Sequence, residues 1–232
     1  MKWELKKYDI KYLTKKSSEF GESKLITRLL LNRGIDTRKK VEKFLNTSEN
    51  DLLDPFLFEN MEKVVERIKL AKLKKEKIVI YGDYDVDGIS GVAYLVIMLR
   101  KLGLNVDYYI PNRVHEGFGI NRSTINFLKR RDTKLFITVD ISINSREEIT
   151  LLKKNGIDII VTDHHRQTTV CDEMEILTIN PKISKSYPNK YLSGSGVAFK
   201  VACAIYERLG MSKKILYDYL DIVMIGTVAD VV

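Results

Sequence analysis

The sequence predicts an α/β fold in which helices cover both faces of a parallel β-sheet, preceded by a helical extension. From Lys77 onward, short β-rich runs such as KIVIY and KLFITV alternate with helical segments, and this alternation is typical of a parallel sheet. The preceding residues show helical patterns without strands. We therefore expect a helical extension over residues 1–59 and an α/β domain over residues 60–232.

The extension and the start of the α/β domain are expected to form several helices. An apolar pattern that includes Leu25 and Leu29 stops at Gly34, and Thr37 is a candidate cap for a short helix that continues to Leu45. After the Asp54-Pro55 breaker, Asn60 is a candidate cap for the next helix. Its apolar residues recur at helical spacing: Met61, Val64, Val65, Ile68 and Ala71.

The α/β domain is expected to contain four strands and the helices between them. The strands are residues 77–81, 106–110, 134–139 and 158–162, and the helices are residues 90–102, 122–131, 145–154 and 197–209. In an open parallel sheet, ligands bind at the carboxyl ends of the strands, near the point where the strand order reverses. We therefore expect the chemistry to follow the strands.

Composition excludes several classes of protein. Of the 232 residues, 44% are hydrophobic and 30% are charged, and no apolar run approaches the ~18 to 20 residues that span a bilayer. The charged N-terminus lacks the apolar stretch of a secretory signal. Cys171 and Cys203 lack metal-site spacing and are expected to be core thiols. These features predict a soluble cytoplasmic protein that does not associate with membranes.

The positive charge is concentrated near the start of the chain. The net charge is +8, of which residues 1–80 hold +7 and residues 81–232 hold +1. Such a basic region is either a solvated helical surface or a patch that attracts nucleic acid. The charge alone leaves both interpretations open.

Carboxylates and imidazoles follow three of the expected strands. Residues 77–81 lead into GDYDVDG, residues 134–139 lead into Asp140, and residues 158–162 lead into Asp163-His164-His165. Clustered carboxylates raise one another's pKa unless cations neutralise them. Oxygen ligands with one or two imidazoles suit Mn²⁺ or Mg²⁺, so the pattern favours a two-metal site.

The same motifs are also compatible in part with other structures. An EF-hand loop that began at Asp83 would need a helix before it and a Glu at its twelfth position, where Tyr94 stands. A single Asp after a strand is most often a helix cap, so Asp140 alone would be weak evidence for a metal site. Residues 194–196, Gly-Ser-Gly, lack the spacing of a nucleotide-binding fingerprint. They form either a tight turn before a helix or a helix N-terminus that suits phosphate.

Six segments together resemble the DHH phosphoesterase superfamily and, within it, the RecJ-type single-stranded-DNA exonucleases. They are GDYDVDGISG, PNRVHEGFGI, ITVD, VTDHH, SGSGVAFKVA and LDIVMIGTVADVV, and they cover nearly all of residues 77–232. The PNRVHEGFG block separates the RecJ type from related pyrophosphatases and short-oligonucleotide phosphodiesterases. Tyr81 also stands where the pyrophosphatases carry a metal-binding His.

The resemblance implies a role for each matching residue. Asp83, Asp85 and Asp87 would belong to the metal cluster, Asp140 would bridge two Mn²⁺ or Mg²⁺ ions, and His164 and Asp230 would complete the shell of the second ion. His165 would face the scissile phosphate and act with Asp140 in catalysis, while Asp163 would orient a neighbouring histidine. Arg113 and the turn Gly194, Ser195 and Gly196 would grip phosphates.

The implied activity is 5′-to-3′ exonuclease cleavage of single-stranded DNA, with release of mononucleotides during DNA repair and recombination. One alternative is a phosphodiesterase for short oligonucleotides or cyclic dinucleotides. Another is a non-catalytic scaffold of replication or repair, although the retained ligand candidates argue against it. Protein partners are not predicted.

Two features depart from the family pattern. In the family, the aspartate at the position of Asp140 is followed by Asn or Cys and then Gly, whereas Ile141 and Ser142 follow it here. The loop thus lacks a glycine that permits close backbone approach. The sequence also stops at Val232, whereas the family continues into a second domain that closes the DNA groove. We therefore expect either an excised catalytic core or a naturally short relative.

Overall fold

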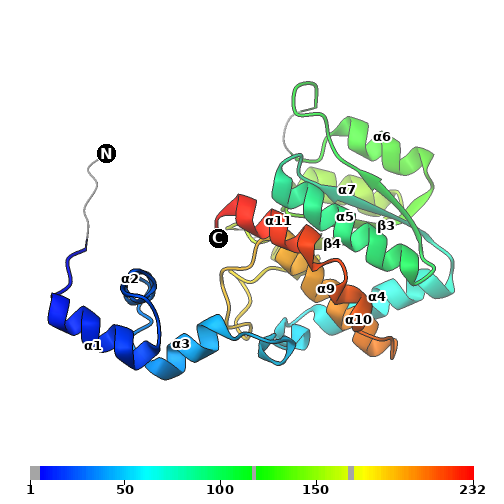
Figure 1. The fold of residues 1–232 in the computed structure, drawn as a ribbon. Coiled ribbons are helices and arrows are strands. Elements are labelled where there is room, and N and C mark those ends of the chain that lie inside the picture. The colour runs from blue at the N-terminus through cyan, green and yellow to red at the C-terminus, as the bar shows by residue number, and fades with distance from the viewer. Residues whose placement is uncertain (1–5, 117–118, 167–169) are drawn as a thin grey trace. The chain divides into compact units, whose positions relative to one another are not determined.

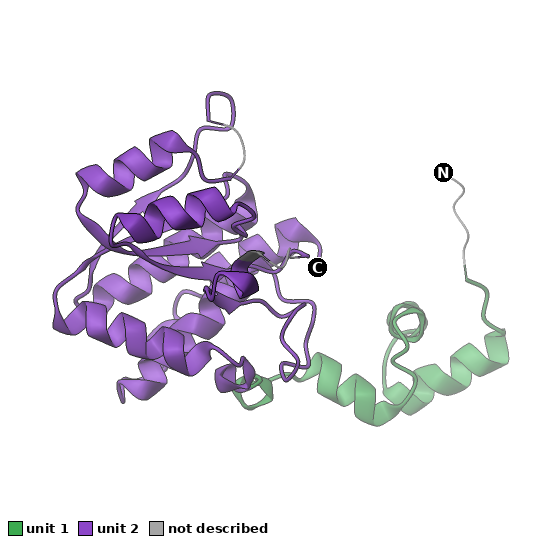
Figure 2. Cartoon of the chain, turned by 180° about the vertical axis from the view of Figure 1, so that it is seen from behind, with its two compact units in different colours: residues 1–53 green, residues 54–232 purple. Residues whose placement is uncertain are grey.

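The computed structural model describes residues 6–116, 119–166 and 170–232. The chain divides into two compact units, residues 1–53 and residues 54–232, which we call unit 1 and unit 2 (Figure 2). The domain boundary that the sequence suggests, between residues 59 and 60, stays a prediction.

Unit 1 is a small helical unit. It contains α1 (Ile10–Phe20), α2 (Lys24–Asn32), α3 (Arg38–Leu45) and the short 3₁₀ helix η1 (Glu49–Asp51). Thr37 caps α3 as expected, because its side chain accepts a hydrogen bond from the backbone N–H of Lys40. The helices share a small apolar core that comprises Leu13, Phe20, Leu30, Leu31 and Val41.

Unit 2 is built on a five-stranded parallel sheet, which confirms the predicted α/β class. The strands are β1 (Lys77–Gly82), β2 (Asn105–Tyr109), β3 (Thr133–Val139), β4 (Asp158–Thr162) and β5 (Leu177–Ile179), in the order β2-β1-β3-β4-β5. The three-residue strand β5 was not predicted. The strand order reverses at β1 and β3, and this is where a ligand site is expected in such a sheet.

Helices cover both faces of this sheet (Figure 1). The helices of unit 2 are η2 (Pro55–Leu57), α4 (Met61–Leu73), α5 (Val86–Lys101), α6 (Arg122–Arg130), α7 (Arg146–Lys154), α8 (Val170–Glu173), α9 (Gly194–Arg208), α10 (Lys214–Tyr217) and α11 (Leu220–Asp230). Helices α6 and α7 share a core with one face of the sheet. Helices α5 and α9 pack against the sheet on the other face, with α4 and α11 beside them.

Strand β1 shows why the sheet is buried on both sides. Val79 and Tyr81 belong to the core that includes α6 and α7, and Ile78 and Ile80, which alternate with them, point to the opposite face. All four side chains are fully buried. A continuous apolar run of this kind is what a parallel strand covered on both faces requires.

Two helices begin earlier than the sequence suggested. Helix α5 starts at Val86 because the Asp85 side chain caps it by accepting the N–H of Gly88. Helix α9 starts at Gly194 because the Ser193 hydroxyl accepts the N–H of Gly196. Residues 194–196 are therefore the first turn of a helix and not a separate turn before it.

The proposed capping role of Asn60 is wrong. Asn60 occupies the position before α4, but its side chain makes no capping hydrogen bond. The side-chain amide instead donates to the carbonyl of Thr178, at 3.2 Å. Asn60 therefore links the start of α4 to β5, a long-range contact that local sequence does not reveal.

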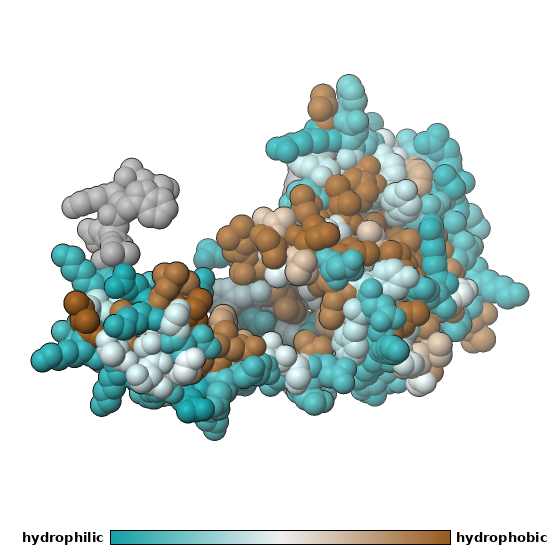
Figure 3. All heavy atoms as spheres, viewed as in Figure 1, coloured by the Kyte–Doolittle hydropathy of each residue, from teal (hydrophilic) through white to brown (hydrophobic). Residues whose placement is uncertain are grey.

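Helix α11 is apolar on its outward side as well as its inward side. Val223 and Gly226 are buried, whereas Met224, Ile225 and Val228 are exposed and form part of the hydrophobic surface seen in Figure 3. Across the part of the chain that the structure describes, no helix is both long enough and apolar enough to cross a membrane.

Candidate metal centre

The strand register brings four polar residues to one edge of the sheet. Gly82 of β1 pairs with Val139 of β3, Val139 pairs with Thr162 of β4, and Thr162 pairs with Ile179 of β5. The residues that follow these four positions are Asp83, Asp140, Asp163 and Asn180. All four are buried. The carboxyl edge of the sheet therefore presents three carboxyl groups and one amide in a row.

Asp140 lies at the centre of this edge in an unusual backbone conformation. Its φ of 61° is in the left-handed region, which aspartate tolerates better than most residues. Its N–H donates to the carbonyl of Thr162 at 2.9 Å, and the Thr138 hydroxyl donates to the carbonyl of Ile141 at 2.7 Å. Burial raises the pKa of Asp140 to about 6, although the nearby His164 opposes the shift.

The backbone conformation of Asp140 explains how the turn closes without the glycine that the resemblance led us to expect after it. The left-handed position of this turn is Asp140 itself, and neither Ile141 nor Ser142 has a positive φ. The Ile141 side chain is fully buried in the core shared with α6 and α7. The turn therefore closes without a glycine at residues 141 and 142.

His164 lies among three carboxylates. Its Nε2 is 3.1 Å from Asp140 Oδ1, 3.6 Å from Asp230 Oδ2 and 3.9 Å from Asp87 Oδ2. Burial lowers the pKa of His164, but the negative charge of the adjacent Asp140 carboxylate outweighs burial and raises the pKa overall. The histidine is 2% exposed, so its ring is largely shielded from solvent.

Asp163 holds the histidine pair in place. Its Oδ1 accepts the backbone N–H groups of His164 and His165, at 2.8 and 3.2 Å, and lies 2.9 Å from Nδ1 of His165. Hydrogen bonding to Asp163 raises the pKa of His165 to about 9, despite the opposing effect of burial. Asn180 donates to the carbonyl of His165 at 2.9 Å. The His165 ring is thus oriented by one neighbour while its side chain stays 53% exposed.

Asp87 is tied to the N-terminus of α9. Its two carboxylate oxygens accept the N–H groups of Gly194, at 2.6 Å, and Ser195, at 2.9 Å. The N–H of Gly196 donates to the Ser193 hydroxyl. These three amides therefore have partners inside the chain, and their predicted role in gripping substrate phosphates stays a prediction.

Asp83 and Asp85 lie on the turn between β1 and α5. Asp83 accepts the N–H of Tyr84 at 2.7 Å, and burial is the main reason that its pKa is raised. Asp85 caps α5 through one carboxylate oxygen and is exposed. The turn therefore offers one buried and one exposed carboxylate next to Asp140.

The predicted ligands form overlapping groups that could hold metal ions. Ligand atoms lie within 4.8 Å of one another in each of three sets: Asp83, Asp85 and Asp140; Asp87, His164 and Asp230; and Asp140, His164 and His165. Several of their atoms are buried without a hydrogen-bond partner: Asp140 Oδ1, Asp230 Oδ2 and both ring nitrogens of His164. Buried polar atoms are normally paired. Donors of this type and number fit Mn²⁺ or Mg²⁺.

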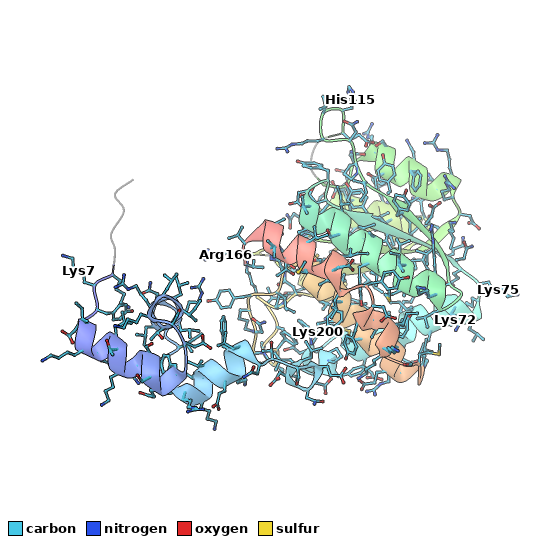
Figure 4. All side chains as sticks on the ribbon, viewed as in Figure 1. Lys7, Lys72, Lys75, His115, Arg166 and Lys200 are labelled. Carbon is cyan, nitrogen blue, oxygen red and sulfur yellow. The ribbon has the colours of Figure 1, made fainter. Side chains whose placement is uncertain are left out.

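The loop after β2 carries Arg113. The loop is organised by Glu116, whose carboxylate accepts the N–H of Asn112 at 2.7 Å and the hydroxyls of Tyr109 and Ser123. The side chain of Asn121 donates to the Glu116 carbonyl at 3.1 Å. These bonds fix the base of the loop, whose tip carries His115 (Figure 4).

Arg113 reaches from this loop toward the carboxylate cluster. Its guanidinium carbon lies 5.1 Å from the centre of the Tyr84 ring, which is a cation–π distance. The positive charge of Arg113 is one of the influences that lower the pKa of Asp83 against the larger effect of burial. The structure therefore places this predicted phosphate ligand beside the turn between β1 and α5.

Sequence reasoning missed three residues that shape the site. Glu116 lies within the PNRVHEGFG block, but its role depends on hydrogen bonds from residues of β2 and α6, which local sequence does not show. Asn180 follows a strand too short to be predicted. Tyr84 sits between two candidate ligands, and its stacking with Arg113 depends on a loop distant in sequence.

Comparisons with known proteins identify the family of the chain. The model of the DHH family, N-terminal domain, matches residues 77–227. The chain is 37% identical over all 232 residues to the single-stranded-DNA-specific exonuclease RecJ of Bacillus subtilis. It is 35% identical over 184 residues to the protein of the same name from Thermus thermophilus. These alignments cover 29% and 27% of the relatives' lengths, so the chain spans less than a third of either one.

Solved structures give the same result. A crystal structure of exonuclease RecJ bound to manganese matches 78% of this chain and 45% of its own length, with a TM-score of 0.69 and 33% identity. RecJ of Thermus thermophilus in complex with Mn²⁺ matches 98% of this chain and 31% of its own length, with a TM-score of 0.73 and 25% identity. The resemblance inferred from the six motifs is confirmed, and the chain belongs to the DHH family.

Proposed function

We propose that this chain is the catalytic core of a metal-dependent phosphodiesterase that degrades single-stranded DNA from its 5′ end and releases mononucleotides. The observation that carries the proposal is the juxtaposition of two ligand groups, Asp83–Asp85–Asp140 and Asp87–His164–Asp230, around the Asp140–His164 pair. The relatives named single-stranded-DNA-specific exonucleases and the manganese-bound RecJ structures support the substrate and the metal.

Two Mn²⁺ or Mg²⁺ ions would be held by these two groups, with Asp140 shared between them. Such ions supply an activated water and neutralise charge on the departing oxygen. Carboxylates this close repel one another, which matches the raised pKa of Asp140 (about 6), to which burial contributes most and Asp87 and Asp85 add. Bound cations would relieve that repulsion.

His165 would stabilise the scissile phosphate. Its pKa of about 9 keeps it positively charged at neutral pH, and Asp163 holds Nδ1 so that the other ring nitrogen points away from this partner. A charged imidazole can donate a strong hydrogen bond to a phosphate oxygen. Arg113, stacked on Tyr84, would bind a neighbouring phosphate and fix the position of the strand.

The proposal is tested with the 232-residue chain, Mn²⁺ and a 20-nucleotide single strand labelled at either end. We expect mononucleotides to be released from the 5′ end, and no product from the Asp140→Asn variant. A control strand that pairs the 5′ end in a duplex should resist cleavage. Faster hydrolysis of a dinucleotide than of the 20-mer would instead support the short-oligonucleotide phosphodiesterase. Internal cleavage, or equal activity of Asp140→Asn, would contradict the proposal.

A further inference from the structure

A second charged feature lies at the other end of the strands, where β1 and β3 begin. A concave surface of about 510 Å³ is found there, and we call it the basic pocket. It is lined by Lys74, Lys75, Glu76, Lys77, Asn105, Arg130, Arg131, Asp132 and Lys134. Figure 4 shows Lys72 and Lys75 at this end of unit 2 and Arg166, which follows the histidine pair, at the other end.

The basic pocket concentrates the positive charge of unit 2. Its lining residues include six cations and two carboxylates, a net charge of +4. Residues 54–232 as a whole carry only +3. The remainder of unit 2 is therefore slightly negative, so the net positive charge of this unit, which attracts anions, lies at the basic pocket.

Ion pairing leaves part of this charge uncompensated. Some of the cations have acidic partners, as Lys134 lies 2.8 Å from Asp132 and Arg131 lies 3.0 Å from Asp107. Glu76 is engaged by Arg67, which does not line the pocket. Among the described residues, Lys74, Lys75 and Arg130 are exposed and have no ion-pair partner within 4 Å.

Helix termini explain only some of these cations. Helices α4 and α6 both end at the basic pocket, and a cation near a helix C-terminus stabilises it by about 0.3 to 1 kcal/mol. Lys72 in the last turn of α4 and Lys129 in the last turn of α6 serve that purpose without lining the pocket, and Arg130, also in the last turn of α6, serves it while lining the pocket. The additional cations of the lining are not required by the helices.

The chemistry of the lining selects the type of ligand. Every lining residue is polar or charged, so no aliphatic or aromatic side chain offers an anchor for a peptide or a platform for a base. A protein partner usually inserts at least one apolar side chain. A sugar-phosphate backbone instead presents regularly spaced negative charges and needs no apolar anchor. The planar guanidinium groups of the adjacent Arg130 and Arg131 suit phosphate oxygens.

We propose that the basic pocket is a second nucleic-acid site, which binds the phosphate backbone of DNA without regard to sequence. The basic pocket lies at the N-terminal ends of the parallel strands and the carboxylate cluster at their C-terminal ends. The two sites therefore lie at opposite ends of the sheet. The second site therefore binds phosphates that are not being cleaved. This role does not depend on the proposed nuclease activity.

The test measures the affinity of the full chain for a 20-nucleotide single strand by fluorescence anisotropy, in EDTA so that the strand stays intact. The variant carries Lys74→Gln, Lys75→Gln and Arg130→Gln. Each phosphate contact contributes roughly 0.7 to the slope of log K against log salt for single strands, so the loss of three contacts should lower that slope by about 2. We expect binding at low salt to weaken at least tenfold.

A control variant removes the same charge elsewhere: Lys63→Gln, Lys182→Gln and Lys214→Gln, three exposed lysines outside the lining. It should keep the wild-type slope, and both variants should keep the wild-type melting temperature within a few degrees. Equal slopes for the two variants would overturn the proposal. A poly-glutamate peptide of matched charge that bound the basic pocket as tightly as DNA would overturn the assignment to a nucleic-acid backbone.

Discussion

Gly194 lies directly against Asp140: a Cβ atom on Gly194 would come within 2.5 Å of the Asp140 Cβ and 2.7 Å of its Oδ1. Real Cβ atoms do not approach so closely, so the absence of a side chain at Gly194 is what allows α9 to begin beside the buried carboxylate. The first turn of α9 thus sets the position of Asp140 from one side. The strand β3 sets it from the other.

This contact predicts that Gly194→Ala displaces Asp140. Overpacking of a tight site costs about 1 to 3 kcal/mol, so we expect a lower free energy of unfolding and a loss of Mn²⁺ affinity of at least tenfold, measured by calorimetry. The control is Gly196→Ala in the same turn, where a Cβ would meet its nearest neighbour at an ordinary 3.5 Å. Equal Mn²⁺ affinity of the two variants would show that Gly194 does not position the ligand.

Asp140→Asn should stabilise the metal-free protein at neutral pH. The folded pKa of about 6 lies above the ordinary 3.8, so the stabilising contribution of Asp140 is fully present below pH 3.8 and is lost as the pH rises through about 6. Asn stays neutral and tolerates the left-handed backbone.

Thermal melting in EDTA tests this prediction. At pH 7.5 the Asn variant should be more stable by about 3 kcal/mol, and near pH 4 the two proteins should be nearly equal. Saturating Mn²⁺ should reverse the order if Asp140 is the proposed metal ligand, because only the wild type keeps that carboxylate. A lower melting temperature of the metal-free variant at pH 7.5 would refute the account of Asp140 as a repelled carboxylate.

Asp163→Asn should lower the pKa of His165 from about 9 toward its ordinary 6.5. The hydrogen bond that Nδ1 of His165 donates to the Asp163 carboxylate is the largest cause of the shift, and an amide oxygen lacks the charge that favours imidazolium. The measurement is an NMR titration of the histidine ring protons, in which a His115→Gln background removes the signal of the exposed loop histidine. An unchanged titration of His165 would mean that Asp163 does not control its charge.

Glu116→Gln should impair substrate binding through Arg113 while sparing chemistry. The substitution weakens the bonds from Asn112, Tyr109 and Ser123 that fix the loop. We expect KM for single-stranded DNA to rise about tenfold, with a smaller change in kcat. If Glu116 acts by positioning Arg113, the double variant with Arg113→Ala should be no worse than Arg113→Ala alone. Additive losses would assign Glu116 a separate role.

Unit 1 offers a test of the basic N-terminal region. If this region contacts DNA, deletion of residues 1–53 should reduce the slope of log K against log salt by roughly 0.7 for each phosphate contact that is lost. Circular dichroism and melting of residues 54–232 would verify that unit 2 folds alone. An unchanged slope would favour the interpretation of these lysines as a solvated helical surface.

Much of the fold follows from local sequence. The runs at residues 77–82 and 133–139 are mainly apolar on both faces, and the helices between them carry apolar stripes. Short segments of sequence are therefore enough to predict the alternation of strand and helix. The carboxylates after the strands were visible for the same reason, because parallel strands bring their carboxyl ends to one edge. The short strand β5 and its Asn180 lacked such a signal, since three residues carry too little pattern.

Tertiary structure alone decided how the predicted residues are used. The register of β1, β3, β4 and β5 aligned Asp83, Asp140, Asp163 and Asn180, and helix packing gave Asp87 two amide partners more than a hundred residues away. The basic pocket likewise joins residues 74–77 to residues 130–134, which are adjacent only because β1 and β3 pair. Sequence determined which side chains occur at each strand end. Their hydrogen bonds and charge interactions depend on distances in space, and those distances are set by the packing of segments that are far apart in the chain.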